Sequence, residues 1–432
     1  MGPAGSGSPG TGPAPAGTVD DTTSTAAPET VGSQSPREGE PSRGDRVRGR
    51  LAGLPVTVRP LLRPLGLYAA SRLLVLLASA VGALLATEAG RPQLTSGPWP
   101  QVSGTGVGAL DGLLRWDSAW YATIAAGGYP ETAVDERIAF FPLFPGLVRA
   151  LMAVTGLGPT TAGLLAASSC GALATVLVWV LGRRLSGEQA ADRMAALFAF
   201  FPGSFTLSMV YAEGLLIVLA PATLLALDAR RWVWAGTFAA LATATRPNSV
   251  AVGAACVWAA FVALRQHRDW RALAAPALAP LGILAYFGYL YQRTGEPLAW
   301  FVAQREVWRE RVDPLAQLDR VLLLLEDPLS PDGSLNTTVP VVGMLVIVVA
   351  FIALWRWRPG GNVVAYAVVS SAMVLTSASI GARPRMVLAA FPLVMALAYV
   401  LRGGWFAAVL ALSAGSLALL TVLTAASLVV TP

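Results

Sequence analysis

This chain of 432 residues contains no lysine, one histidine and two cysteines. All 31 basic residues are therefore arginines, a bias that a GC-rich genome explains without any functional reason. His267 lies in a basic loop, and Cys170 and Cys256 fall inside separate apolar segments. A structural zinc site needs about four clustered ligands, and a cysteine in an apolar run is usually a small buried hydrophobe. These absences argue against a zinc protein and against a fold held by disulfides.

Charged residues are also scarce, at 13% of the chain, whereas soluble domains carry about 25%. Hydrophobic residues form 55%, and apolar runs long enough to cross a bilayer recur from about residue 65 onward. The predicted fold class is an all-α polytopic membrane protein of the cell membrane. The net charge of +6 comes mostly from short loops, so it reports on membrane topology and gives no reason to expect a nucleic-acid partner.

Residues 1–56 are rich in Gly, Pro, Ser and Thr and nearly lack large apolar side chains. Such a segment cannot bury enough surface to offset its ordering entropy, so we predict a disordered tail. Arginines accumulate between Arg37 and Arg63, directly before the first apolar run, and the positive-inside rule then places the N-terminus in the cytoplasm. Residues 57–432 form the predicted membrane domain.

The apolar runs predict about eleven membrane-crossing segments, with the C-terminus outside. They are 65–86 and 160–182, two tight hairpins between 191 and 268, then 273–291, 338–356, 362–380, 386–401 and 404–430. Segment 144–158 is short and has a proline at its second position, so we predict an in-plane or re-entrant helix. The limb 191–202 is too short to cross about 30 Å, so it must tilt, continue past Pro202 or stop in a cavity. Two long external loops remain, 88–158 and 292–338.

The stretch from Arg115 to Tyr129 follows the first span and contains Asp117 between Trp116 and the pair Trp120-Tyr121. Aromatic side chains around the acid could limit its contact with water, and a partly shielded carboxylate can act as a general base near neutral pH. Asp117 is therefore the candidate catalytic residue. The alternative is that Asp117 only caps the N-terminus of a helix in the loop. Spacing alone does not decide between the two.

Three arginines, Arg246, Arg383 and Arg385, lie at short external turns, against the positive-inside rule. Guanidinium groups bind phosphate oxygens in pairs, so these residues are candidates for holding a phosphate. The alternative for each is an arginine that reaches to lipid headgroups. Glu213 stands at the outer end of an apolar helix and needs a partner, and Arg246 from the neighbouring hairpin is the expected one. That pair either ties two helices together or contacts a substrate.

Other acids in the first loop are weaker candidates. Asp111 lies six residues before Asp117, and Asp135-Glu136 read as a solvated turn.

Several segments together resemble a known family. The run from Arg115-Trp116-Asp117 to Tyr129, followed by 139–145 (AFFPLFP), is similar to the first luminal loop of the PIG-V family. These proteins are glycosylphosphatidylinositol mannosyltransferases II and their bacterial relatives. Three further segments agree in order: 201–213 with its Phe-Pro and Tyr-Ala-Glu motifs, 245–248 (TRPN), and Arg383/Arg385 ahead of Phe391-Pro392. The resemblance covers about residues 65–400.

The resemblance implies a GT-C membrane glycosyltransferase that takes sugar from a polyprenyl-phosphate sugar, with Asp117 as the essential carboxylate. The candidate substrate-binding residues, from the loop motifs and the exceptional charges together, are Arg115, Trp116, Trp120, Tyr121, Tyr211, Glu213, Arg246, Asn248, Arg383 and Arg385. Two positions depart from the family, because Gly214 stands where Ser is more common and Ser249 where Gly is common. The acceptor of the eukaryotic members, a glycosylphosphatidylinositol, is not expected to be the acceptor of this chain.

The leading hypothesis is a mannosyltransferase that uses polyprenyl-phosphate-mannose as donor on the extracytoplasmic face. Its partners would be membrane lipids, the donor, and a glycolipid, glycan or protein acceptor of the cell envelope. No cofactor is expected with certainty, and the sequence does not say whether a divalent metal assists. The alternative from another class is a transporter or flippase of lipid-linked sugars, which shares the broken helices and the phosphate-binding arginines. A third possibility is a non-catalytic relative that serves as an assembly partner.

Overall fold

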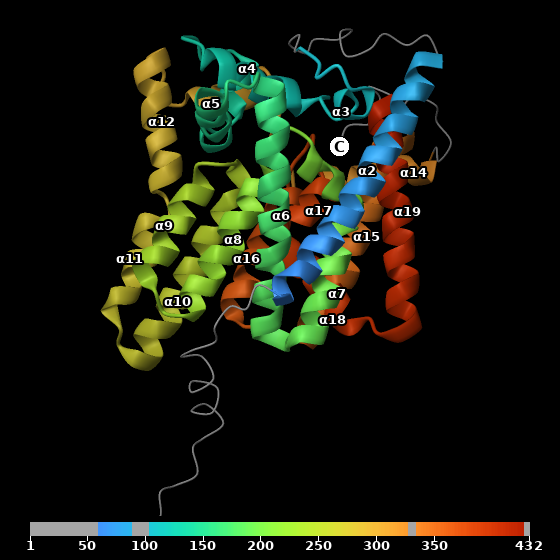
Figure 1. Cartoon of the computed structure of the whole chain (residues 1–432). Helices are drawn as coiled ribbons and strands as arrows, with labels where there is room; N and C mark the ends of the chain where they lie inside the picture. The colour runs from blue at the N-terminus through green and yellow to red at the C-terminus, as the bar shows by residue number, and fades with distance from the viewer. Residues whose placement is uncertain (1–58, 89–102, 327–333, 427–432) are drawn as a thin grey trace, which may run out of the picture. The chain divides into compact units, whose positions relative to one another are not determined.

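The computed structural model describes residues 59–88, 103–326 and 334–426, and the regular structure in these ranges is helical (Figure 1). A single β-bridge, between Val312 and Ser377, is the other backbone pairing in this part of the chain. Contacts along the chain divide it into Met1–Val56 and Thr57–Pro432, and the fold below is that of the second unit. The predicted disordered tail, 1–56, lies outside the described residues.

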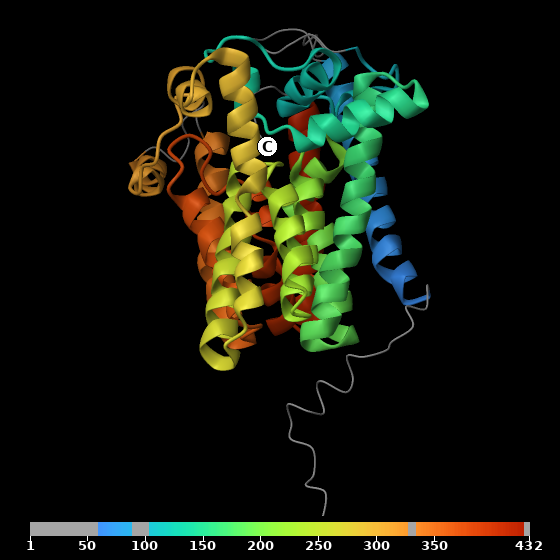
Figure 2. The same cartoon turned by 90° about the vertical axis from the view of Figure 1, so that its left-hand side faces the viewer.

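Six helical stretches are long and apolar enough to cross a membrane. They contain the helices α2 (Leu62–Glu88), α6 (Pro159–Ser186), α10 (Val250–His267), α12 (Leu281–Thr294), α15 (Ser334–Trp357) and α19 (Gly403–Ala426). Figures 1 and 2 show them running in the same general direction as one bundle. The prediction of an all-α membrane protein is confirmed.

A second group of helices is too short to cross a bilayer alone. It comprises α7 (Glu188–Ala199), α8 (Glu213–Asp228), α9 (Trp232–Thr243), α16 (Gly361–Leu375) and α18 (Phe391–Val400). The 3-10 helix η3 (Pro202–Ser208) meets α8 at 105°, and this bent pair counts as a seventh span if it is one crossing. All eleven predicted segments contain helix, but the count of eleven spans is not confirmed, because hydrophobic runs do not reveal where a helix breaks.

Two expectations about individual segments can be compared with the structure. α7 ends at Ala199 and passes into η3, so the short limb stops inside the bundle near Pro202. Segment 144–158 forms α5 (Leu143–Thr155), which is not among the candidate spans. Figure 2 shows α5 lying across the direction of α6 at one end of the bundle, as expected for an in-plane helix. It ends at Gly156, whose φ of 72° suits glycine and few other residues.

Both predicted external loops contain helices at the same end of the bundle (Figure 2). The first carries α3 (Gly108–Asp111), α4 (Asp117–Gly127), the 3-10 helix η2 (Glu136–Ala139) and α5. The second carries α13 (Ala299–Glu306) and α14 (Ala316–Glu326). They therefore cover the end of the bundle toward which α2 runs.

The core has two parts of different composition. Among the short and long helices of the bundle, many of the buried residues are alanines, and small side chains let helix backbones approach closely. At Gly282 a Cβ would lie 1.9 Å from the carbonyl oxygen of Ala240, so α12 and α9 need glycine there. Beneath the first loop the buried residues are mainly large and aromatic, including Tyr121, Phe141 and Tyr286. This aromatic cluster anchors the loop on the bundle.

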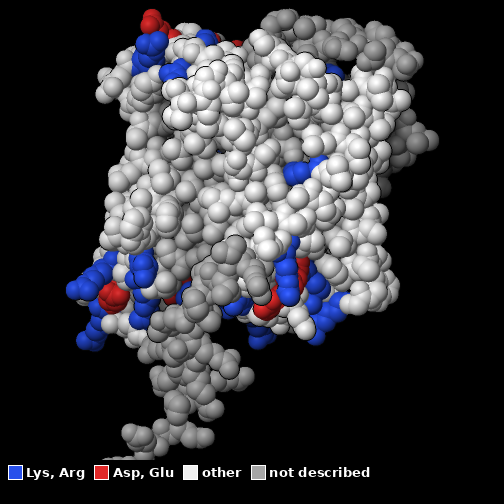
Figure 3. All heavy atoms as spheres, viewed as in Figure 1, with Lys and Arg blue, Asp and Glu red and all other residues white. Residues whose placement is uncertain are grey.

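Charged side chains gather at the two ends of the face shown in Figure 3, and a broad band between them is almost free of charge. The larger group lies at the end where α2 begins. Such a band is the surface expected of helices that face hydrocarbon.

Candidate active site

Asp117 is the first residue of α4, and its carboxylate pairs with an arginine that is far away in the sequence but adjacent in space. Its Oδ2 lies 2.5 Å from Nη1 of Arg385, and its backbone N–H donates to the hydroxyl of Tyr211 at 3.2 Å. The cap of α4 is Trp116, and no side chain caps the helix. The alternative of Asp117 as a helix cap is therefore wrong, because the carboxylate is used in an ion pair.

Trp116 carries backbone strain directly before this acid. Its φ of 59° with ψ of −127° falls in a region that a bulky residue rarely adopts. Strained residues persist only where the surrounding structure imposes them, and they occur often at functional sites. The strain sets the turn that brings Asp117 out at the start of α4.

A chain of alternating charges continues from Asp117 into the bundle. Arg385 lies 3.7 Å from Oε1 of Glu213, and the same oxygen lies 2.5 Å from Nη1 of Arg246. The side chains of Arg246 and Arg385 are each 10% exposed, and that of Glu213 is fully buried. The predicted pair between Glu213 and Arg246 forms. Arg385 joins it to Asp117, which spacing along the sequence did not reveal.

Each member of this chain stands where a helix breaks. Tyr211 and Glu213 lie at the bend between η3 and α8, Arg246 lies between α9 and the 3-10 helix η4 (Pro247–Ser249), and Arg385 lies in α17 (Pro384–Ala389). At membrane depth, irregular backbone is tolerated where protein buries it or where it lines a cavity. The breaks therefore explain how polar groups reach the interior of an apolar bundle.

Burial and charge act in opposite ways on the two arginines of the 383–385 segment. Burial lowers the pKa of Arg383 to about 10, helped by the like charges of Arg385 and Arg320. Burial also lowers the pKa of Arg385, but the carboxylate of Asp117 and other negative partners outweigh it, so its pKa lies above the ordinary value. Both guanidinium groups are therefore charged at neutral pH.

A cavity of about 290 Å³ opens beside this charged chain. Six of the predicted site residues line it: Trp116, Asp117, Tyr121, Arg246, Arg383 and Arg385. Tyr211 stands behind them, with the Arg385 guanidinium 5.4 Å from its ring centre, and Glu213 bridges the two arginines. The structure thus brings eight predicted residues together.

The other three predicted residues neither line the cavity nor join the charged chain beside it. Arg115 is buried and its Nε has no hydrogen-bond partner among the described residues. Trp120 is buried against Phe140, with ring centres 6.4 Å apart. The amide of Asn248 is buried, and in the described part of the chain neither its nitrogen nor its oxygen finds a hydrogen-bond partner. These residues were placed in the site by the family motifs, which do not distinguish lining from supporting positions.

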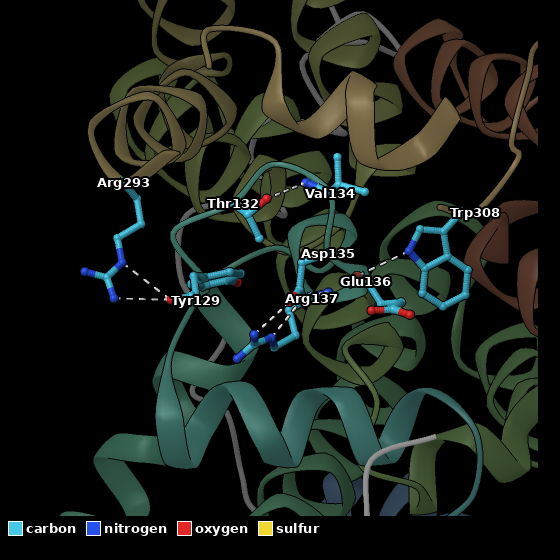
Figure 4. A network of polar contacts seen from close by, with 8 residues as sticks. All are labelled: Tyr129, Thr132, Val134, Asp135, Glu136, Arg137, Arg293 and Trp308. Carbon is cyan, nitrogen blue, oxygen red and sulfur yellow. Dashed lines mark hydrogen bonds and ion pairs between the residues drawn. The ribbon is translucent and has the colours of Figure 1, made fainter. Parts of the chain in front are cut away.

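The loop 292–338, predicted to be external, supplies residues that sequence reasoning missed. Gln304, Trp308 and Glu310 line the cavity opposite the first loop, together with Ser379. Trp308 donates its indole N–H to the carbonyl oxygen of Glu136 at 3.2 Å, which joins the two loops (Figure 4). The carboxylate of Glu310 accepts from the backbone N–H of Ala378 at 2.9 Å, close to the arginine segment. The sequence signal that could have identified these residues is Trp308 two positions before Glu310 in a polar loop.

The remaining acids of the first loop have local roles. Asp111 accepts from the N–H of Thr105 at 2.5 Å and from its hydroxyl at 2.7 Å. Asp135 caps η2 and pairs with Arg137 at 2.7 Å, as Figure 4 shows. The prediction of a solvated turn at Asp135-Glu136 is wrong for Asp135, whose side chain is 17% exposed. Within the described ranges, no three His, Cys, Asp or Glu side chains cluster as a metal site.

Part of the chain is similar in sequence to known proteins. Residues 70–281 match the family model described as Mannosyltransferase (PIG-V). This part of the chain is similar to the PIG-V family. The prediction made from the first loop is confirmed, and the match contains Asp117, Tyr211, Glu213 and Arg246 but ends before Arg385.

A curated relative is GPI alpha-1,6-mannosyltransferase 2 of Cricetulus griseus, 34% identical over 160 residues. The alignment covers 34% of this chain and 31% of the relative, so the chain spans about a third of that protein's length.

Two solved structures are similar to part of this chain at a low TM-score. ArnT from Cupriavidus metallidurans, bound to undecaprenyl phosphate, matches with 16% identity and a TM-score of 0.43, over 64% of this chain and 53% of ArnT. AglB from Archaeoglobus fulgidus, in complex with an inhibitory peptide and a dolichol-phosphate, matches with 15% identity and a TM-score of 0.40, over 82% and 56%. The family assignment rests on the family model and not on these two likenesses.

Proposed function

We propose that this protein is a membrane mannosyltransferase that moves mannose from polyprenyl-phosphate-mannose to a lipid-linked or cell-envelope acceptor. The observation that carries the proposal is the meeting of one carboxylate and three arginines, Asp117 with Arg246, Arg383 and Arg385, on one cavity beside an apolar bundle. The match of residues 70–281 to the family model described as Mannosyltransferase (PIG-V) supports the choice of mannose.

In the proposed reaction the acceptor hydroxyl gives its proton to Asp117 while its oxygen attacks the anomeric carbon. The bond from that carbon to the phosphate oxygen breaks, and the electron pair leaves with the polyprenyl phosphate, so the configuration inverts. Oδ2 of Asp117 is paired with Arg385, which leaves Oδ1 as the oxygen that accepts the proton. General-base help of this kind contributes about 10²–10⁴-fold to a rate.

The ion pair between Asp117 and Arg385 couples proton transfer to departure of the phosphate. While Asp117 is ionised, it neutralises much of the charge of Arg385, 2.5 Å away. Once Asp117 is protonated, that charge becomes available to the leaving phosphate, where negative charge is developing. Arginines placed at such a position lower the barrier because they are already oriented before the reaction.

We place the cavity on the extracytoplasmic face and the N-terminus in the cytoplasm. This orientation follows from the arginines at the loops that close the bundle near the start of α2, since short cytoplasmic loops carry the excess of positive charge. Donor and acceptor would both approach from the surrounding lipid.

The decisive experiment compares Asp117→Asn with wild type in a purified, reconstituted protein. The substrates are radiolabelled polyprenyl-phosphate-mannose and the lipid extract of a deletion strain, and the readout is label in a new lipid or polymer. We expect kcat to fall by about 10²–10⁴-fold. Asp135→Asn is the control, because that acid lies in the same loop but pairs only with Arg137.

Full transfer by a folded Asp117→Asn protein would remove the mechanism. Movement of labelled lipid between leaflets without any transfer by wild type would instead assign the protein to the class of transporters.

A further inference from the structure

Arg72 is a charged residue inside α2, one of the helices long and apolar enough to cross the membrane. It is 8% exposed, and no carboxylate lies within ion-pairing distance of it in the described part of the chain. A charge at membrane depth is costly unless other groups compensate it, and such residues are rare for that reason. The function proposed above makes no use of Arg72.

The guanidinium of Arg72 binds the break between α7 and η3. Nη1 donates to the carbonyl oxygen of Ser204 at 2.6 Å and to the hydroxyl of Ser208 at 3.0 Å. Nη2 donates to the carbonyl oxygen of Ala199 at 3.2 Å and to the hydroxyl of Ser204 at 3.0 Å. The ring of Tyr68 lies 4.8 Å from the guanidinium carbon. Ala199 ends α7, so its carbonyl has no partner in a continuing helix.

This arrangement explains how the helix can stop inside an apolar bundle. Backbone carbonyls in hydrocarbon must find donors, and arginine presents five N–H groups in a fixed fork. Arg72 supplies those donors from a neighbouring helix, and it holds both ends of η3 through Ser204 and Ser208.

η3 in turn touches both partners of Asp117. A Cβ added to Gly203 would lie 2.3 Å from the carbonyl oxygen of Pro384 and 2.6 Å from the nitrogen of Arg385, so the backbones are in direct contact. At its other end, η3 leads within three residues to Tyr211, whose hydroxyl accepts from the N–H of Asp117. The carboxylate and the backbone of Asp117 are therefore both held by groups adjacent to η3.

We propose that Arg72 is a positioning residue for the transfer reaction, acting through η3 on Arg385 and Tyr211. The proposal rests on the proposed function, because it assigns Arg72 to the same site. Removal of Arg72 frees η3 to shift, and with it the pair between Arg385 and Asp117. A displacement of about 1 Å at reacting groups can cost about 10²-fold in rate.

The test compares Arg72→Gln and Arg72→Lys with wild type in reconstituted protein. We expect kcat to fall by about 10²-fold in Arg72→Gln, with little change in the KM for the donor. Arg72→Lys should lose less kcat because lysine keeps the positive charge, but it should not reach wild type because an ammonium group lacks the planar fork of donors. Arg193→Gln is the matched control, since Arg193 also donates to backbone carbonyls, of Ala398 and Gln189, but does not touch η3. Wild-type kcat in a folded Arg72→Gln protein would overturn the proposal.

A milder pair of variants covers the case in which Arg72→Gln does not fold. Ser208→Ala removes one acceptor of Arg72 at one end of η3, and Ser204→Ala removes a second near the other end. We expect both to lower kcat, and the double variant to lose less than the product of the two single losses, because the residues act through one segment. Independent, multiplicative losses would overturn the route through η3.

Hydrogen exchange separates a failure of this proposal from a failure of the proposed function. Arg72→Gln should speed exchange in residues 199–212 and in 383–390, whereas Arg193→Gln should not. This readout needs no substrate, so it stands even if wild type shows no transfer. Unchanged exchange in 383–390 would contradict the coupling from η3 to Arg385.

Discussion

The arginines of this protein divide into two groups, those that pair with an acid at the surface and those that pair with an acid inside the bundle. Arg63, near the start of α2, pairs with Glu188 at 2.6 Å, with 58% and 45% of the two side chains exposed. Arg246 pairs with Glu213 at a similar distance of 2.5 Å, but those side chains are 10% exposed and fully buried. Equal distances thus describe very different interactions, because water screens the first pair and protein surrounds the second.

The difference lies in what happens when one partner is lost. An exposed arginine can be solvated when its acid is removed, so exposed pairs contribute about 0–1 kcal/mol. A buried arginine left without its acid is a buried charge without compensation, which costs about 3–5 kcal/mol. The buried chain from Asp117 to Arg246 should therefore fail as a unit, whereas the exposed pairs should be replaceable one at a time.

The largest expected effect comes from Glu213→Leu, which leaves Arg246 buried without its acid. We expect the free energy of unfolding to fall by about 3–5 kcal/mol, measured by denaturant unfolding in detergent. The double variant Glu213→Leu/Arg246→Met should recover much of that loss, because apolar side chains can replace a buried pair, but it should not recover transfer. A single Glu213→Leu variant as stable as wild type would show that water reaches Arg246.

Arg385→Gln tests the central member of the chain. It removes the partner of Asp117 and one charge from the phosphate position, so we expect kcat to fall by about 10²–10³-fold. The control is Arg305→Gln, since Arg305 pairs with Glu306 in the second external loop with 75% of its side chain exposed. Equal losses from the two variants would erase the distinction between buried and exposed arginines.

The smallest effect is expected from Arg63→Ala. Its contacts with Glu188 and Asp192 are mostly exposed, so unfolding free energy should change by about 1 kcal/mol at most and transfer should be unaffected. Added salt should reduce the difference further in the same unfolding assay. A loss comparable with that of Glu213→Leu would mean that exposure does not govern the strength of these pairs.

Much of the site was predictable because its signals are local. The run from Arg115 to Tyr129 combines an acid with aromatic residues in a chain poor in charge, and Asp117 does line the cavity. The partner of Asp117 lies 268 residues away, and no pattern in the sequence joins the two. Trp120 lies in the same motif as Asp117, and Asn248 in the same motif as Arg246, but neither lines the cavity. A motif gives neighbours along the chain and not the direction of each side chain.

The sequence by itself determined the class of protein, the shortness of α5 and the similarity of residues 70–281 to the PIG-V family, because these follow from composition, apolar run length and local motifs. Only the tertiary structure decided where the helices break, and so which charged groups meet inside the bundle. It joined Asp117 to Arg385, brought Trp308 and Glu310 of the second loop to the cavity, and placed Arg72 at the end of α7. The physical reason is that unsatisfied carbonyls and charges in an apolar interior must find partners in space, and those partners are distant in sequence.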